Sequence, residues 1–261
     1  FFIIFFGTAI FFSIPTFYKY ENYTQKIEDK INKEFKIKIY NLEDISFRFI
    51  PSPHLVIKKA DFKIRENETY SISKLENIKI YISISELYKS KDFKIKKILV
   101  SKANLYLNSQ SLKNFIHNLK KNIVNHFIIK RSKLFFKNDK NEIILISTIN
   151  NFNYKIDFVN NKKILKINGN IFDLDYEFKY VIDYSEHNIQ NINLKFKNPN
   201  VVIENKLIDD YSENFNQTGS LKFEFLNHNN IVKYNIKNNK ISFLNKNTKN
   251  SNFDLNGSIN F

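Results

Sequence analysis

The chain has 261 residues, of which 43% are hydrophobic, and it contains 27 Phe and 14 Tyr. This apolar and aromatic content is too high for a disordered protein, although 26% of the residues are charged. The absence of Cys excludes disulfides, thiol catalysis and thiolate metal sites. Four Gly and four Pro are too few for a collagen-like or glycine-loop protein. We therefore expect a folded chain whose turns are built mainly from Asn, Asp and Ser.

The formal charge of +15 would attract phosphates of nucleic acid or of anionic lipids. The lysines are scattered in pairs, however, as at Lys58-Lys59 and Lys120-Lys121, and are not gathered into one tract. Lys, Asn, Ile, Phe and Tyr are also the residues that an AT-rich genome supplies in excess. Aromatic residues lie between lysines at 133–137 and 194–198, as in base-stacking surfaces. We nevertheless predict no nucleic-acid partner, because the charge is dispersed and because we expect a membrane anchor at the start of the chain.

That anchor is the uncharged segment from Phe1 to Tyr18, which precedes Lys19. A helix needs about 20 apolar residues to cross the hydrocarbon core, and a few residues ahead of Phe1 would complete the span. We predict a single-pass transmembrane anchor over residues 1–20. The alternatives are a cleaved signal peptide, which ends in a small-x-small site, and a buried core helix. The apolar positions of the predicted anchor include Phe1, Ile4, Phe6, Ile10, Phe12 and Phe17.

Two amphipathic helices are predicted behind the anchor. Tyr23, Ile27, Ile31 and Phe35 recur at steps of four within 21–35. Ser111 is a suitable N-cap for a second helix. The apolar positions of this second helix are Leu112, Phe115, Ile116, Leu119, Ile123 and Phe127. We expect both apolar stripes to pack on a sheet.

Elsewhere the apolar residues alternate with polar ones, which predicts strands with one apolar face. Members of this pattern include Ile45, Phe47, Phe49, Ile78, Ile80, Ile82, Ile84, Leu194, Phe196, Leu221, Phe223, Phe225, Ile241 and Phe243. Turns such as Asn160-Asn161 and Asn238-Asn239 favour antiparallel hairpins, and two helices are too few for parallel crossovers. We predict a mostly β (α+β) fold, in which residues 21–261 form a long curved antiparallel sheet with two helices. The alternation persists to Phe261 and no Met stands at position 1, so we expect the protein to extend beyond both ends.

No residues gather into a recognisable catalytic motif. The sequence lacks GxSxG, Walker A, GxGxxG and HExxH strings. Asp173 and Asp175 would share a face if their segment were a strand, but a solvated turn is the simpler interpretation. The five histidines are expected to be dispersed surface residues, and they are His54, His117, His126, His187 and His228. We predict a protein that is not an enzyme and has no cofactor or metal.

Three stretches resemble the N-terminal region of the bacterial AsmA-like envelope proteins. Residues 47–64 give a strand, a Pro51-x-Pro53 corner and a second apolar strand running into Ala60-Asp61-Phe62. Residues 73–107 give an alternating strand, a short leucine-bearing segment at 86–88 and a basic strand pair. Residues 128–156 resemble the hairpin that follows the family's helix. The resemblance covers roughly residues 1–180, with Asn or Lys replacing the glycines usual at its turns.

This resemblance implies a bacterial inner-membrane protein whose main domain faces the periplasm. It implies an open β-groove, apolar inside, that binds or conducts phospholipid between inner and outer membranes. The residues expected to line the groove are Ile78, Ile80, Ile82, Ile144, Ile146, Phe152, Tyr154, Ile156 and Phe158. The expected partners are phospholipid and the inner membrane.

Two alternatives stay open. The apolar face could instead be covered by the helices or by a second sheet, because alternation alone does not separate an open groove from a closed core. The protein could also be an anchored scaffold that contacts other envelope proteins and affects outer-membrane protein assembly without carrying lipid.

Overall fold

The computed structural model divides into two compact units, Phe1–Ile149 (unit 1) and Asn150–Phe261 (unit 2). Each unit is described by itself. The residues described are 2, 6, 7, 10, 24–35, 38–50, 52–63, 73–83, 95–112, 125–185, 188–210, 216–226, 228–244 and 256–260.

Unit 1 contains helix α2 (Thr24–Phe35) and a sheet in which neighbouring strands follow chain order. Its strands are β1 (Lys38–Arg48), β2 (His54–Lys63), β3 (Ser73–Ile82), β4 (Ile95–Asn108), β5 (His126–Lys137) and the first part of β6 (Ile143–Asp157). Strands β1 to β4 pair antiparallel, whereas β4 and β5 are parallel.

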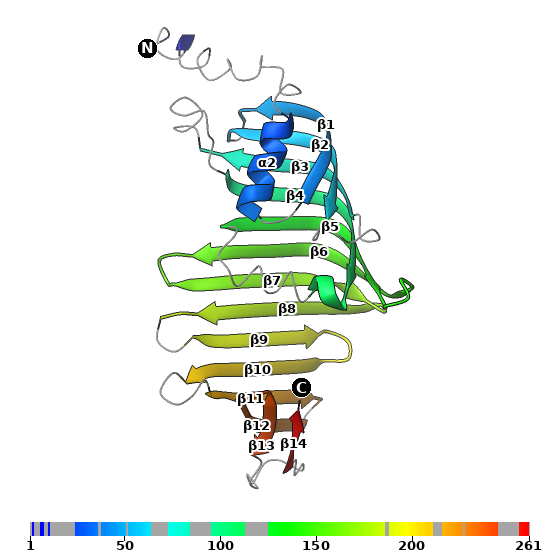
Figure 1. Cartoon of the computed structure of the whole chain (residues 1–261), viewed down its shortest axis with the longest axis vertical. Coiled ribbons are helices and arrows are strands. Elements are labelled where there is room, and N and C mark those ends of the chain that lie inside the picture. The colour runs from blue at the N-terminus through cyan, green and yellow to red at the C-terminus, as the bar shows by residue number, and fades with distance from the viewer. Residues whose placement is uncertain are drawn as a thin grey trace. The chain divides into compact units, whose positions relative to one another are not determined.

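Helix α2 lies across one face of the unit 1 sheet (Figure 1). Its residues Ile27 and Ile31 are almost fully buried, and both belong to the predicted four-residue stripe. The first predicted helix is therefore confirmed. Apolar side chains spaced by four residues lie on one side of a helix, and burying them against the sheet stabilises a segment too short to be helical alone.

The prediction of a purely antiparallel sheet is wrong, because β4 and β5 run in the same direction. The reason is the connection over 109–125, which is long enough to return the chain to the edge from which β4 started. Residues 109–112 of this connection are helical. The sheet is consequently mixed, although the broader prediction of a mostly β fold is confirmed.

The second helix also begins at a different residue from the one predicted. Asn108, not Ser111, is the N-cap: its Oδ1 accepts from the Ser111 N–H at 2.8 Å, and its own N–H donates to Ser111 Oγ at 2.8 Å. This reciprocal pairing places Ser111 at the third helical position. Phe127, expected on the apolar stripe, lies instead in β5.

The predicted transmembrane anchor falls almost wholly outside the described residues, which include only positions 2, 6, 7 and 10 of the first twenty. Within the part of the chain that is described, no helix is both long and apolar enough to cross a membrane.

Unit 2 is an open sheet of antiparallel strands that follow chain order. It contains the rest of β6 followed by β7 (Lys162–Ile171), β8 (Leu174–Asp183), β9 (Ile189–Phe196), β10 (Val201–Asp210), β11 (Asn216–Phe225), β12 (His228–Lys237), β13 (Lys240–Leu244) and β14 (Asn256–Asn260). The predicted Asn turns are confirmed. Asn161, Asn238 and Asn239 have φ values of 50°, 49° and 58°, a left-handed conformation that Asn tolerates well.

One two-residue turn of unit 2 is made from an unfavourable residue. Phe172 and Asp173 join β7 to β8 with φ values of 50° and 61°, and Phe172 is 70% exposed. A bulky side chain in this backbone region is strained, and here burial does not offset the cost.

We expect Phe172→Asn to raise the free energy of unfolding by about 0.5–1 kcal/mol, because Asn tolerates the left-handed conformation. Urea unfolding of parent and variant measures the change. Val159→Asn, at a 93% exposed position without a positive φ, is the control and should leave stability unchanged. Equal stabilisation by both substitutions would contradict a backbone origin.

Candidate functional site

The strand registers of unit 2 gather apolar residues on one face of its sheet. Directly opposed residues of paired strands point to the same face, so the registers can be followed from β7 to β12. They give three parallel rows: Gly169, Tyr176, Phe196, Val201, Phe225 and His228; Ile167, Phe178, Leu194, Ile203, Phe223 and Asn230; and Leu165, Tyr180, Ile192, Asn205, Leu221 and Val232. We call the surface made by these rows the unit 2 apolar face.

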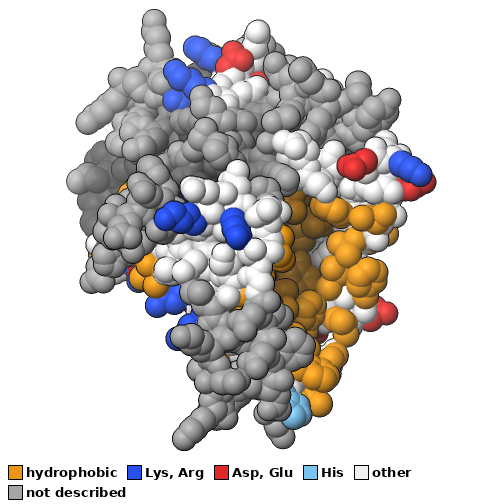
Figure 2. Space-filling view, turned by 60° about the horizontal axis from the view of Figure 1, so that its bottom comes forward, with side chains coloured by type: hydrophobic (Ala, Val, Ile, Leu, Met, Phe, Trp, Pro, Cys, Tyr) orange, Lys and Arg blue, Asp and Glu red, His pale blue; other side chains and the backbone are white. Residues whose placement is uncertain are grey.

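The large apolar side chains of this face are exposed along β11 and are mostly half-buried on the other strands. Phe223 is 41% exposed, and Leu221 and Phe225 are exposed to a similar extent. Figure 2, turned to bring forward the end where β14 lies, shows hydrophobic side chains gathered in a hollow. A monomeric protein rarely leaves so many adjacent large apolar side chains in water unless they bind something.

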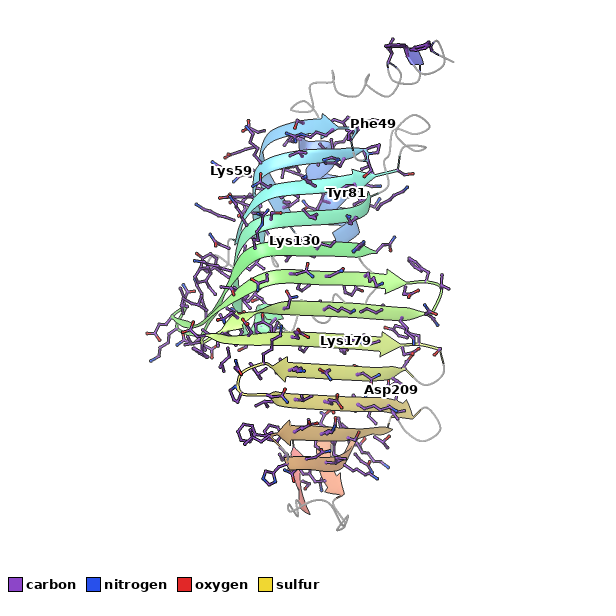
Figure 3. The ribbon with its side chains drawn as sticks, turned by 180° about the vertical axis from the view of Figure 1, so that it is seen from behind. Phe49, Lys59, Tyr81, Lys130, Lys179 and Asp209 are labelled. Atoms are coloured by element: carbon purple, nitrogen blue, oxygen red, sulfur yellow. The ribbon has the colours of Figure 1, made fainter. Side chains whose placement is uncertain are left out.

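The opposite face of the same strands is mainly polar, although it also carries Ile164, Val181, Ile189, Val202, Ile208 and Ile231. It carries Lys166, Lys179, Glu177, Lys195, Glu204, Lys206, Lys222, Glu224 and Lys233. Figure 3 marks Lys179 in the middle of β8. Ion pairs join Lys222 to Glu224 at 3.1 Å and Lys162 to Asp183 at 2.8 Å. The sheet is therefore amphipathic, with a solvated basic face behind an apolar one.

Polar side chains lie along one margin of the apolar face, near the ends of β8 and β10. Three hydrogen bonds join them in pairs: Tyr180 Oη to Gln190 Oε1 at 2.8 Å, Tyr234 Oη to Asn205 Oδ1 at 2.6 Å, and Gln217 Nε2 to Asp209 Oδ1 at 2.7 Å. Lys163 lies in the next row, directly opposite Ile182, which in turn opposes Gln190. We call these seven polar residues together with Tyr184 the polar margin.

Two tyrosines near this margin, Tyr154 and Tyr180, have raised pKa values. Burial, with a smaller effect from Tyr184, raises the pKa of Tyr154 to about 12. Burial, then Tyr184 and Asp209, raises the pKa of Tyr180 to about 12. The Tyr180 hydroxyl is the donor in its hydrogen bond to Gln190 Oε1.

Tyr234 lies flat across Gly219, the residue directly opposite it in β11. A Cβ at position 219 would overlap the far end of the tyrosine ring, so only Gly lets Tyr234 reach Asn205 on β10. The Tyr234 ring thus fills the space left by the missing side chain of Gly219. Its hydroxyl group gives Asn205 a hydrogen-bond partner on this face of the sheet.

The apolar face of unit 1 is a closed core. Ile57 and Ile80 are 0% exposed, and they lie in a set of buried aliphatic residues that extends from β1 to β5. Ile78 and Ile82, two further residues expected to line a groove, are also buried. In unit 1, therefore, the predicted alternation corresponds to residues packed away from solvent.

The remaining predicted groove residues do not share one environment. In unit 1, Ile144 and Ile146 are exposed, while Ser147 and Ile149 of the same strand are buried. In unit 2, Phe152 and Tyr154 are buried, Ile156 is half-buried and Phe158 lies exposed in the turn after β6. Buried positions are odd-numbered up to Ile149 and even-numbered from Phe152, so simple alternation does not hold through β6.

The candidate chemical residues are not brought together. Asp173 lies in a turn and Asp175 in β8, so the two carboxylates do not share a strand face. His126 and His228 begin separate strands, and His117 and His187 lie outside the described residues. Over the described ranges, no three His, Cys, Asp or Glu side chains could hold a metal.

His54 differs from the predicted surface histidine, because it is 1% exposed. Its Nδ1 lies 2.6 Å from the Ser52 carbonyl oxygen, and its ring stacks on Tyr81 at 5.1 Å between centroids. The ring packs between neighbouring strands at the point where β2 begins, which the sequence pattern did not indicate.

Asp183, at the end of β8, gives the clearest expected pH dependence. Hydrogen bonds from Lys162, then from Ser185, lower its pKa to about 2. A carboxylate with a lowered pKa stabilises the fold above its unfolded pKa of about 3.9, and this contribution is lost as the pH falls toward 2.

We expect Asp183→Asn to destabilise unit 2 at pH 7, with the difference from the parent shrinking between pH 4 and pH 2. Urea unfolding at a series of pH values measures it. Asp175→Asn is the control, because the bond that the Asp175 carboxylate accepts from Asn170 Nδ2 is long, at 3.3 Å. A cost for Asp183→Asn that does not change with pH would contradict the carboxylate as its origin.

No family model matches this chain, and a comparison with curated proteins finds no match. The resemblance to AsmA-like proteins accordingly remains a prediction from residues 1–180.

Sequence reasoning identified the alternation at Leu221, Phe223 and Phe225 but did not select these residues as lining the site. The signal that could have found them is the presence of three large apolar residues at alternating positions of one short strand. No helix is predicted after this strand that could cover them. Gln190, Asn205 and Lys163 carried no such signal, because their position on the apolar face follows only from strand register.

Proposed function

We propose that this protein is a membrane-anchored, non-enzymatic envelope protein that binds or conducts phospholipid along the unit 2 apolar face. The proposal includes the N-terminal anchor, an inner-membrane location and a periplasmic main domain, as the resemblance to AsmA-like proteins implies. It places the acyl chains on unit 2, since the apolar face of unit 1 is packed as a core.

The observation that carries the proposal is the gathering of large apolar side chains on one face of unit 2, where Leu221, Phe223 and Phe225 of β11 are exposed. At about 4.8 Å per strand spacing, the rows from β7 to β12 extend roughly 24 Å. Each leaflet contributes about 15 Å of hydrocarbon to a bilayer, so the rows are long enough for an acyl chain. Removing the chain and the face from water together would be favourable by about 25 cal/mol per Å² of apolar surface.

The amphipathic character of the sheet supports transfer without chemistry. A polar, lysine-rich rear face keeps the strands solvated while the apolar face holds hydrocarbon. Phospholipid movement along such a face requires no catalytic residue, because no covalent bond is broken or formed.

The test is photocrosslinking in the full chain reconstituted into vesicles. A phospholipid with a diazirine in its acyl chain is activated by light, and the labelled peptides are mapped by mass spectrometry. We expect labels on β9 to β12, at residues such as Leu194, Phe223 and Phe225. Labels confined to residues 1–20 would contradict lipid binding by unit 2 and would favour the anchored scaffold.

A further inference from the structure

Two turns of unit 2 expose a large apolar side chain on a strained backbone. Phe172, between β7 and β8, has a φ of 50° and is 70% exposed. Leu226, between β11 and β12, has a φ of 52° and is 62% exposed. The other described non-glycine residues with a positive φ are all Asn, Asp, Lys or Arg. Phe172 and Leu226 therefore carry two costs that Asn would avoid, a bulky left-handed residue and an apolar side chain in water.

These two turns lie at the same end of the unit 2 strands. Strands β7 to β12 alternate in direction, so the turns that follow β7, β9 and β11 share one end of the sheet (Figure 1). We call this end, with residues 172–173, 197–200 and 226, the turn edge. The first and last of its turns are four strand spacings apart, about 19 Å. Two costly residues at one end of a sheet indicate a function for that end.

The turn edge is continuous with the unit 2 apolar face. Ile171 and Leu174 pair with each other across the base of the β7–β8 turn, and they lie on the same face as Gly169. Phe225, which belongs to the same row as Gly169 and is 38% exposed, directly precedes Leu226. Apolar surface consequently extends from the rows of the sheet to both turns.

We propose that Phe172 and Leu226 insert into the surface of a phospholipid bilayer, so that the turn edge is a membrane contact separate from the predicted N-terminal anchor. The inference goes beyond the proposed function, because it adds a second contact with the membrane. It places that contact where the apolar face reaches the end of the strands, so an acyl chain could pass from the bilayer onto the face without crossing water.

The separation of the two side chains favours a bilayer over a protein partner. Phe172 and Leu226 project from different turns about 19 Å apart. The turn between them, residues 197–200, is exposed and carries no large apolar side chain. One apolar pocket in a partner protein could not hold both side chains, whereas a bilayer accepts separate apolar groups without a matching shape. Such insertion is driven by the apolar area that leaves water.

The experiment uses single-tryptophan variants, because the chain contains no Trp. Full chains carrying Phe172→Trp or Leu226→Trp are reconstituted into phosphatidylcholine vesicles, with and without brominated acyl chains. We expect blue-shifted emission from both variants and loss of most of that emission in the brominated vesicles, since bromine quenches a Trp that lies among the acyl chains.

Phe158→Trp is the matched control. Phe158 is 72% exposed in the turn after β6, at the opposite end of the strands, and its φ is not positive. Its Trp emission should stay at long wavelength and should not change with bromine. Circular dichroism verifies that each variant is folded, and the second tip variant decides the question if the first is not.

Three results would overturn the membrane contact. They are unquenched emission from either folded tip variant, equal quenching at position 158, and blue-shifted emission that bromine does not quench, which would place the tips against protein. The proposed function would survive each of them, because it is judged by acyl-chain labels on β9 to β12. Quenching at both tips without such labels would support the membrane contact and overturn the proposed function.

Discussion

Replacement of Phe223 by Asp is expected to reduce phospholipid labelling of unit 2 at least tenfold without unfolding the protein. Phe223 lies in the middle row of the apolar face and is 41% exposed, so its ring is available to a ligand. Burying a Phe side chain is worth about 1.5–3 kcal/mol, which this variant loses, and an unpaired carboxylate would then face hydrocarbon. Photocrosslinking yield per folded molecule measures the effect.

Thr218→Asp supplies the control for this variant. Thr218 lies in the same strand, but its side chain points to the polar face and is exposed. The new charge there should change neither labelling nor stability by more than a small amount. If Phe223→Asp unfolds unit 2 in thermal denaturation, or leaves labelling unchanged, then Phe223 is not part of a lipid-binding surface.

The sequence predicted the nature of the elements better than their pairing. The alternation at Ile45 and Phe47, and the stripe of Ile27 and Ile31, are local periodicities that burial of one face imposes, and both were found. The parallel pairing of β4 and β5 depends on where the 109–125 connection leads. The predicted helix in that connection was the available signal, because a helix between two strands of one sheet favours a crossover.

Sequence periodicity did not predict whether each apolar residue is buried or exposed. Ile80 and Phe223 stand in strands with similar alternation, yet one is fully buried and the other is 41% exposed. Exposure depends on what covers a face, and that is a matter of tertiary packing which periodicity does not encode. Likewise, the approach of Tyr234 to Asn205 requires both the register of three strands and the absence of a side chain at Gly219.

The apolar face of unit 1 is buried, whereas that of unit 2 is partly exposed. The second large effect that we expect is therefore on the stability of unit 1. Ile80→Ala should lower the free energy of unfolding of unit 1 by about 2–5 kcal/mol, because Ile80 is 0% exposed and its truncation leaves a cavity in a packed core. Hydrogen exchange, read separately on peptides of β2 to β4 and of β8 to β11, measures the loss and assigns it to unit 1.

Ile144→Ala is the same substitution at a 55% exposed position of unit 1, and it should change stability by no more than about 0.5 kcal/mol. Comparing Ile80→Ala with Ile144→Ala also decides whether Ile80 is a core residue or a groove-lining residue. A core residue destabilises unit 1 when truncated but leaves phospholipid labelling of unit 2 unchanged in the folded fraction. A groove-lining residue would do the reverse, so reduced labelling by Ile80→Ala without lost protection in β2 to β4 would extend the lipid-binding surface into unit 1.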